Sequence, residues 1–137
     1  ADAGFESLGI SDHFHPWNDE QGSSPFVWSV IGALSREVDL PVATHVTCPT
    51  IRIHPAIIAQ AAATASLLLG GRFVLGVGSE EALNEQVLGE RWPLADERLE
   101  MLEEAIEVMR APLLRRACPP LQQARPAHSR LRLCLRS

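Results

Sequence analysis

The segment that most constrains the fold is the short run at residues 73–77, Phe-Val-Leu-Gly-Val, which contains no polar side chain. A strand with one solvated face alternates apolar and polar side chains, whereas a strand of a parallel sheet is covered on both faces and reads as continuously apolar. The run follows Gly70 and Gly71 and ends at Gly78, and glycines commonly terminate regular structure. It therefore predicts a buried parallel strand with helices packed on its sheet.

Strand-like and helix-like segments alternate around this run. The strand-like segments are 8–11 and 41–47, and the helix-like segments are 25–38, 55–69 and about 96–110. Pro55 suits a first helical turn, Asp96 is the expected N-cap of the last helix, and Pro112 lies just past its expected end. This order predicts an α/β fold with parallel strands, which could be a (β/α)8 barrel or a doubly wound sheet.

The composition divides the chain near Pro112. All 17 acidic residues lie in 1–112, whereas 113–137 holds six of the 12 basic residues and no acid. We therefore expect a partial barrel in 1–112 and a basic Arg/Pro-rich tail in 113–137 outside the fold, although 131–136 has a strand-like pattern. A basic tail can bind nucleic acid, but an irregular extension is the simpler interpretation, so no nucleic-acid partner is expected. No apolar run is long enough to predict a membrane span.

Polar residues follow each predicted strand. The first strand leads into 12–17, Asp-His-Phe-His-Pro-Trp, the second into 47–50, Thr-Cys-Pro-Thr, and the third into 78–85. The carboxyl ends of parallel strands meet at one edge of a sheet, and a histidine and a carboxylate brought together there suit acid–base catalysis near neutral pH. Each residue also has an ordinary structural role, such as Asp12 in a turn or Glu80 in a first helical turn. Both interpretations are open on spacing alone.

Two further interpretations remain open from the residues. His13 and His15 are similar to the metal ligands of barrel-type hydrolases, with Asp12 assisting, but such a site needs ligands from later strands. The three cysteines lack the spacing of a zinc site or a disulfide framework, so no metal site is assigned. The third possibility is a non-catalytic fragment or a binding module with a basic tail.

Five blocks of sequence occur in an order that resembles one family. They lie at 11–17, 24–28, 46–52, 71–79 and 81–85. Together they resemble the luciferase-like, coenzyme F420-dependent oxidoreductases, in particular the F420-dependent glucose-6-phosphate dehydrogenase group. The resemblance covers about residues 3–111. It implies a luciferase-like (β/α)8 TIM barrel, truncated at both ends, of which this chain carries about three βα units.

The resemblance also implies a reaction and a set of site residues. A hydride would pass from an alcohol carbon, for example that of a sugar phosphate such as glucose 6-phosphate, to the deazaflavin of F420 rather than to FMN. His13 and Glu81 would be the acid–base pair, and Trp17 would wall the substrate pocket. The cofactor-binding residues would be Asp12, Val46, Cys48, Ser79, Glu80 and Asn84. A full-length relative would be a cytoplasmic homodimer acting on a small molecule, whereas the chain as given is expected to be incomplete and inactive.

Overall fold

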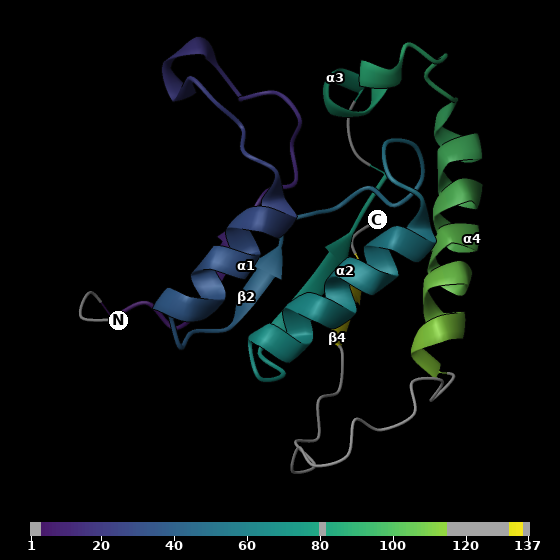
Figure 1. Cartoon of the computed structure of the whole chain (residues 1–137). Coiled ribbons are helices and arrows are strands. Elements are labelled where there is room, and N and C mark those ends of the chain that lie inside the picture. Colours follow the sequence, from purple (N-terminus) through teal and green to yellow (C-terminus); the bar gives the residue numbers. More distant parts are fainter. Residues whose placement is uncertain (1–3, 80–81, 115–131, 136–137) are drawn as a thin grey trace.

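The computed structural model describes residues 4–79, 82–114 and 132–135, which form a four-stranded sheet with helices packed against it (Figure 1). The strands are β1 (Leu8–Ile10), β2 (Val42–Thr44), β3 (Phe73–Val77) and β4 (Arg132–Leu135). The helices are α1 (Val27–Glu37), α2 (Pro55–Leu68), α3 (Ala82–Glu85) and α4 (Ala95–Leu114), with short 3-10 turns η1 (Asp19–Gln21) and η2 (Gln86–Leu88).

The strands lie in the sheet in the order in which they occur in the chain. β1 pairs with β2, β2 with β3 and β3 with β4, and all three pairings are parallel. A doubly wound sheet reverses its strand order at a switch point, whereas a barrel keeps consecutive strands as neighbours. The predicted parallel α/β class is confirmed, and the described strands follow the barrel order.

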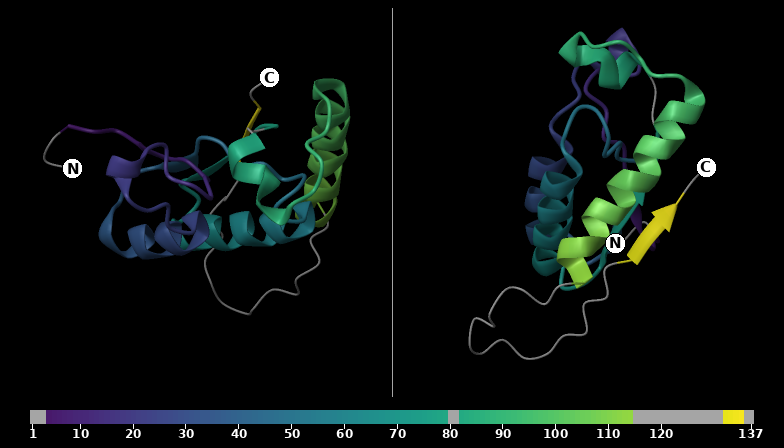
Figure 2. Two further views of the ribbon diagram at one scale, coloured as in Figure 1. Left: turned by 90° about the horizontal axis from the view of Figure 1, so that it is seen from above. Right: turned by 90° about the vertical axis from the view of Figure 1, so that its right-hand side faces the viewer.

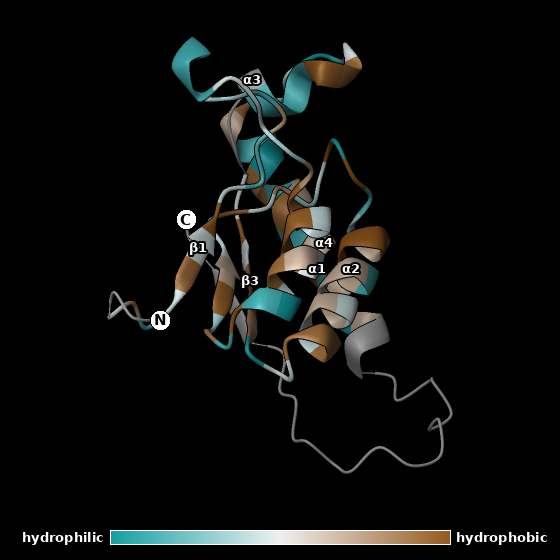
Figure 3. Ribbon diagram, turned by 60° about the vertical axis from the view of Figure 1, so that its left-hand side comes forward, coloured by the Kyte–Doolittle hydropathy of each residue, from teal (hydrophilic) through white to brown (hydrophobic). Residues whose placement is uncertain are grey.

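The core lies between the sheet and the helices. Figures 1 and 2 show α1 and α2 side by side along the sheet, with α4 next to α2. Figure 3 shows apolar residues along the strands and on these helices. The largest fully buried apolar side chains come from all of these layers: Val27, Ile31, Val42, Ile58, Leu69, Phe73, Leu75, Val77 and Met109. Burying each of the larger ones contributes about 1.5–3 kcal/mol, so this layer stabilises the parallel sheet.

Helix α2 begins and ends where its sequence predicts. Pro55 occupies the first turn, and the Nδ1 atom of His54 accepts a hydrogen bond of 3.2 Å from the Ala56 amide as the N-cap. The chain leaves the helix through Gly70 and Gly71, whose φ angles are +60° and +83°. Glycine adopts these angles without a Cβ clash, so the pair stops the helix and turns the chain into β3.

Helix α4 differs from its prediction at both ends. It begins at Ala95, so Asp96 lies inside the first turn and is not the N-cap. Instead, the Glu97 carboxylate accepts a hydrogen bond of 2.9 Å from the Leu94 amide. The helix backbone continues to Leu114, past Pro112. Pro112 removes one amide donor from the helix, but the rest of α4 packs along its length, so the helix does not end there.

Gly76 in β3 is required by the close approach of two strands. Thr44 Oγ1 donates to the Gly76 carbonyl at 2.9 Å and accepts from the Gly76 amide at 3.0 Å. A Cβ at Gly76 would run into the Thr44 carbonyl oxygen, and one at Gly78 would lie 2.8 Å from Val46 Cγ2. The Gly76-x-Gly78 pattern, which resembles part of a dinucleotide fingerprint, is therefore explained by strand packing.

The strand-like pattern near the end of the chain does form a strand. Arg132–Leu135 pairs in parallel with β3, from Val74 to Val77. The division of the chain at residue 112 stays a prediction, since most of 113–137 lies outside the described residues. Among the helices that are described, none combines the length and the apolar composition needed to cross a membrane.

Candidate active site at the carboxyl edge of the sheet

The segments that follow β1 and β3 rise from the same edge of the sheet (Figure 1). Asp12 follows β1, the segment that contains Arg52 joins β2 to α2, and Asn84 and Glu85 belong to α3 after β3. Asp12, Asn84 and Glu85 are 1%, 2% and 0% exposed. Polar side chains so deeply buried need partners. Arg52 supplies them to Asp12 and Glu85, and the amides of Phe14 and His15 supply them to Asn84.

Arg52 joins the three segments. Its Nη2 atom donates to both the carbonyl oxygen and the Oδ1 atom of Asp12, at 2.8 and 3.0 Å. Its Nε atom donates to Glu85 Oε1 at 3.1 Å, and its backbone amide donates to Glu85 Oε2 at 3.2 Å. The planar guanidinium therefore fixes the end of β1 and helix α3 in one geometry, which is the role that arginine serves better than lysine.

The network contains more negative than positive groups. Two buried carboxylates face one guanidinium whose side chain is 9% exposed. Burial alone would lower the pKa of Arg52, but the negative charges of Asp12 and Glu85 and their hydrogen bonds outweigh it, so its pKa is raised above the ordinary value. Arg52 is therefore charged at every pH at which an enzyme is assayed. The Asp12 Oδ2 atom is buried and has no hydrogen-bond partner within the described part of the chain.

The loop that carries His13 is fixed through its backbone. Asn84 Oδ1 accepts hydrogen bonds from the amides of Phe14 and His15 at 3.1 and 3.2 Å. The Ser24 hydroxyl donates to the His13 carbonyl oxygen at 2.6 Å. Because Arg52 binds the preceding carbonyl of Asp12, hydrogen bonds fix every residue from 12 to 15. Such backbone contacts hold a loop without using the side chain of His13.

The side chains of His13 and Trp17 lie against each other. Their ring centroids are 4.9 Å apart at an interplanar angle of 57°. His13 is half-buried, whereas Trp17 is 66% exposed. The exposed tryptophan provides an apolar surface beside the half-buried imidazole. A ligand that binds there can cover both rings.

The end of β2 adds a third set of groups. The peptide bond between His45 and Val46 is cis, and Val46 lies against Gly78 of the neighbouring strand end. Cys48 is buried, with its Sγ atom 3.1 Å from Thr50 Oγ1. The Thr47 Oγ1 atom is buried and, like Asp12 Oδ2, has no hydrogen-bond partner among the described residues.

The structure brings together only part of the predicted site. It links Asp12 to α3, which contains Asn84, places His13 against Trp17, and sets Val46, Cys48 and Ser79 at the ends of β2 and β3. Glu80 and Glu81 lie outside the described residues. The metal-site alternative gains no support, since the described residues include no cluster of three or more potential ligands.

Sequence reasoning missed Arg52 and Glu85. Both belong to blocks that carry the family resemblance, but Arg52 is 40 residues from Asp12 and 33 from Glu85 along the chain. One sequence signal for Arg52 was its position between Ile51 and Ile53, in a loop where an arginine has no nearby acid in sequence. Arginine in an apolar setting implies a buried partner, although sequence alone does not name that partner.

Taken together, the parallel α/β order and the polar network at the strand ends define a protein of the barrel class with a candidate site at the carboxyl edge. The chain belongs to the luciferase-like monooxygenase family, whose model matches residues 1–127. Among curated proteins, it is 46% identical over 109 residues to an F420-dependent glucose-6-phosphate dehydrogenase of Segniliparus rotundus and 45% identical over 107 residues to that of Microbacterium testaceum. These relatives confirm the resemblance drawn from the sequence blocks.

Solved structures agree with this assignment. An F420-dependent secondary alcohol dehydrogenase in complex with an F420-acetone adduct is 33% identical, with a TM-score of 0.82 over 98% of this chain and 44% of its own. The oxygenating constituent of 3,6-diketocamphane monooxygenase from Pseudomonas putida, a type II Baeyer-Villiger monooxygenase in complex with FMN, is 21% identical. Its TM-score is 0.63 over 79% of this chain and 29% of its own, which shows the fold alone.

The matched segments are short relative to the whole relatives. The matches to the Segniliparus rotundus and Microbacterium testaceum enzymes cover 78% and 77% of this chain but 32% of each enzyme. The chain thus spans about a third of the length of the curated relatives it matches, which accords with the expected partial barrel.

Proposed function

We propose that the protein to which this segment belongs is an F420-dependent oxidoreductase that oxidises an alcohol carbon of a small molecule. The observation that carries the proposal is the likeness, over 98% of the chain, to a structure of an F420-dependent secondary alcohol dehydrogenase. The curated relatives, which are F420-dependent glucose-6-phosphate dehydrogenases, make a sugar phosphate such as glucose 6-phosphate the first substrate to test. A cytoplasmic location is part of the same proposal.

The residues at the carboxyl edge fit a deazaflavin with hydrogen-bonding groups. Asp12 Oδ2 and Thr47 Oγ1 are buried polar atoms without partners in the described part of the chain, and a ligand donor or acceptor would satisfy them. Bound F420 would supply the ring carbon that accepts a hydride. Val46, Cys48, Ser79 and Glu80 are the further residues that we propose to line its site.

Alcohol oxidation requires that the O–H proton leave as the hydride leaves the neighbouring C–H bond, so that the carbon becomes a carbonyl. We assign the base that takes this proton to His13, because its loop is fixed on both sides, by Arg52 at the Asp12 carbonyl and by Asn84 at the Phe14 amide. Trp17, whose ring lies 4.9 Å from the imidazole, would wall the substrate pocket. Glu81 is proposed as the second acid–base group, and Asn84 serves the site through the amides of the His13 loop. A positioned acid–base group contributes about 10²–10⁴-fold in rate.

A chimera provides the test of this proposal. Residues 4–112 would replace the aligned segment of the Segniliparus rotundus enzyme, and F420 reduction by glucose 6-phosphate would be followed by deazaflavin fluorescence. We expect saturable F420 binding and turnover by the chimera, and neither by the 137-residue chain alone. The His13→Ala and Glu81→Gln variants should lose turnover and keep F420 affinity. Failure of the chimera to bind F420 while the parent enzyme binds it would refute the proposal.

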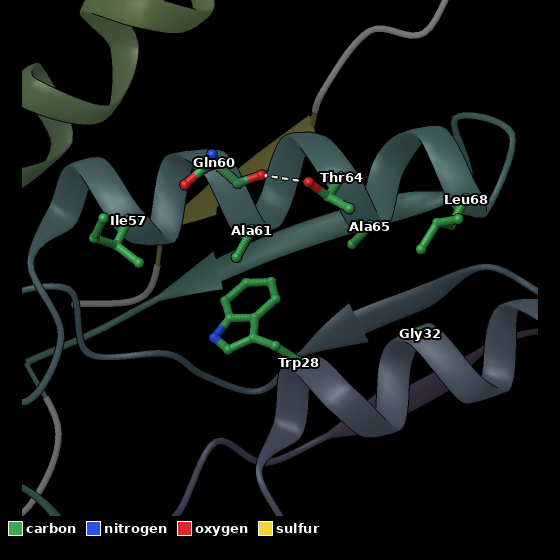
Figure 4. Close-up of a pocket in the computed structure, with 8 residues that line it drawn as sticks. All are labelled: Trp28, Gly32, Ile57, Gln60, Ala61, Thr64, Ala65 and Leu68. Atoms are coloured by element: carbon green, nitrogen blue, oxygen red, sulfur yellow. Dashed lines mark hydrogen bonds between the residues drawn. The ribbon is translucent and has the colours of Figure 1, made fainter.

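We also propose that the full-length protein is a homodimer and that α1 and α2 supply its interface. The groove in Figure 4 lies between these helices, with the Trp28 indole directed toward α2. Helix α2 carries no charged residue, and its Ile57 and Leu68 side chains are 55% and 51% exposed at this groove. A surface without charge offers no complementarity to a charged partner, and a second copy of the same apolar surface matches it.

The oligomeric state of the chimera tests the interface. A lysine placed at the groove would bury an unpaired charge if two copies meet there, so Leu68→Lys should give a monomer in sedimentation analysis. Leu99→Lys is the matched control, since Leu99 is an exposed leucine (47%) on α4, away from the groove. A dimer that survives Leu68→Lys, or dissociates equally with Leu99→Lys, would place the interface elsewhere.

A further inference from the structure

We propose that Arg52 is a positioning residue of this site, which sets the place of the His13 loop by fixing Asp12 and helix α3 together. The catalytic consequence of this role rests on the proposed function, whereas its structural consequence does not. Arg52 contacts neither His13 nor Trp17 in any described hydrogen bond, so it acts on them through the backbone.

The first step of the argument is the geometry of the guanidinium. Nη2 binds Asp12 twice and Nε binds Glu85, so the two directions of one planar group fix the distance between the end of β1 and α3. The Arg52 amide binds the second Glu85 oxygen, which also fixes the loop between β2 and α2 to α3. A lysine would keep the charge but could not donate along both directions from one rigid plane.

The second step is the path from α3 to His13. Asn84 is the neighbour of Glu85 in α3, and its Oδ1 atom holds the Phe14 and His15 amides. Arg52 therefore reaches the loop twice, once through Asp12 before His13 and once through Glu85 and Asn84 after it. Displacement of α3 would release both amides, and displacements on the order of 1 Å at a reacting group can reduce rates about 10²-fold.

The third step is that the network is buried. The Arg52, Asp12 and Glu85 side chains are 9%, 1% and 0% exposed, so water cannot replace a lost contact at low cost. The exposed pair of Arg72 and Asp39 has the same chemistry without this burial, with side chains 38% and 104% exposed. Arg72 is therefore a matched control for substitutions of Arg52.

Amide hydrogen exchange in the 137-residue chain tests the structural part without any cofactor. In Arg52→Lys, we expect the Phe14 and His15 amides to exchange at least about tenfold faster while those of α2 keep their rates, because the opening is local. Arg72→Lys should leave both regions unchanged. If Arg52→Lys does not fold by circular dichroism, Glu85→Gln decides by the same measurement, since it weakens the same contact without removing the guanidinium.

Two results would overturn the positioning role. One is unchanged exchange at Phe14 and His15 in both Arg52→Lys and Glu85→Gln. The other is equal acceleration in the loop and in α2, which would mean that Arg52 only stabilises the fold as a whole. Exchange is measured without F420, so these outcomes are independent of whether the proposed function holds.

Kinetics of the chimera test the catalytic part. We expect Arg52→Lys to lower kcat about tenfold to a hundredfold with a smaller change in the KM for glucose 6-phosphate, and Arg72→Lys to match the parent. An unchanged kcat in Arg52→Lys would overturn the catalytic consequence. If the unsubstituted chimera shows no F420 turnover, the proposed function fails while the exchange result still decides the structural role of Arg52.

Discussion

The two edges of the sheet carry the same ionic chemistry in opposite environments. At the carboxyl edge, Arg52 pairs with Asp12 and Glu85, and all three side chains are at most 9% exposed. At the amino edge, Arg72 precedes β3 and pairs with Asp39 at 3.3 Å, but the Asp39 side chain is fully exposed. One edge therefore holds its charges inside the protein, and the other holds them in water.

The difference in burial between the two ion pairs shows at which edge of the sheet the positions of side chains are held most strictly. A buried ion pair gains little net stability over apolar packing, but removal of one partner leaves an uncompensated charge and is costly. An exposed pair is screened by water and contributes little in either direction. In parallel α/β folds the carboxyl edge carries function, whereas residues at the amino edge serve stability. The buried network therefore lies at the carboxyl edge, where the positions of side chains affect function.

The largest effect is expected from removing the central charge of the buried network. Arg52→Met leaves the Asp12 and Glu85 carboxylates buried without their cation, which should lower the free energy of unfolding by about 3–5 kcal/mol. Urea unfolding of the 137-residue chain followed by circular dichroism measures this loss, and the absence of a folded baseline would be its extreme form. Arg72→Met should give no measurable change, and equal losses in the two variants would remove the contrast between the edges.

The next effect concerns the glycine that allows β2 and β3 to approach. Gly76→Ala should cost about 1–3 kcal/mol, because the new Cβ meets the Thr44 carbonyl, which is backbone and cannot rotate away. Gly32→Ala in α1 is the control, since nothing lies within 4 Å of its Cβ position. Alanine is the better helix former, so Gly32→Ala should stabilise the chain by about 0.5–1 kcal/mol. If Gly76→Ala left the thermal unfolding temperature unchanged, β2 and β3 would be able to move apart to accommodate the new Cβ.

The order of elements could be predicted from the sequence because its signals are local. The apolar run of β3, the Pro55 start of α2 and the glycines after it each act within a few residues, and all three predictions are confirmed. The predicted ends of α4 were wrong. The true start depends on a side-chain contact, and the true end depends on the helix passing a proline, and local rules specify neither. Glu97 caps the Leu94 amide from inside the helix, and the helix passes through Pro112.

The edge of the sheet at which the predicted site residues lie could be predicted, but the contacts that link them could not. Asp12, His13 and Trp17 follow a strand and lie at one edge, as the spacing indicated. The link among the segments depends on Arg52 and Glu85, whose contacts join positions far apart in sequence, and no pattern of spacing specifies such pairs. The contact of Asn84 Oδ1 with the loop amides was also not predicted, whereas its part in cofactor binding stays a prediction.

A smaller effect separates the glycines of the two edges. Gly70 lies near the amino edge with φ of +60°, and its Cβ position is 3.4 Å from Arg72 Nη1, the end of a flexible side chain. Gly70→Ala should therefore cost about 1–2 kcal/mol through backbone conformation alone. Gly70→Asn should recover part of this loss, because asparagine tolerates the left-handed region, whereas Gly76→Asn should not. Urea unfolding of these three variants and of Gly76→Ala distinguishes the conformational cause from the steric one.

The smallest effect is the response of the two ion pairs to salt. At 1 M salt the Debye length falls to about 3 Å, so the coupling between Arg72 and Asp39 should vanish. Double-mutant cycles with Arg72→Met and Asp39→Asn, and with Arg52→Met and Glu85→Gln, measure both couplings in the 137-residue chain. The coupling between Arg52 and Glu85 should change little with salt, because neither side chain is solvated. If it falls as steeply as that of the exposed pair, water reaches the carboxyl edge, and the His13 loop is then not fixed by a dry network.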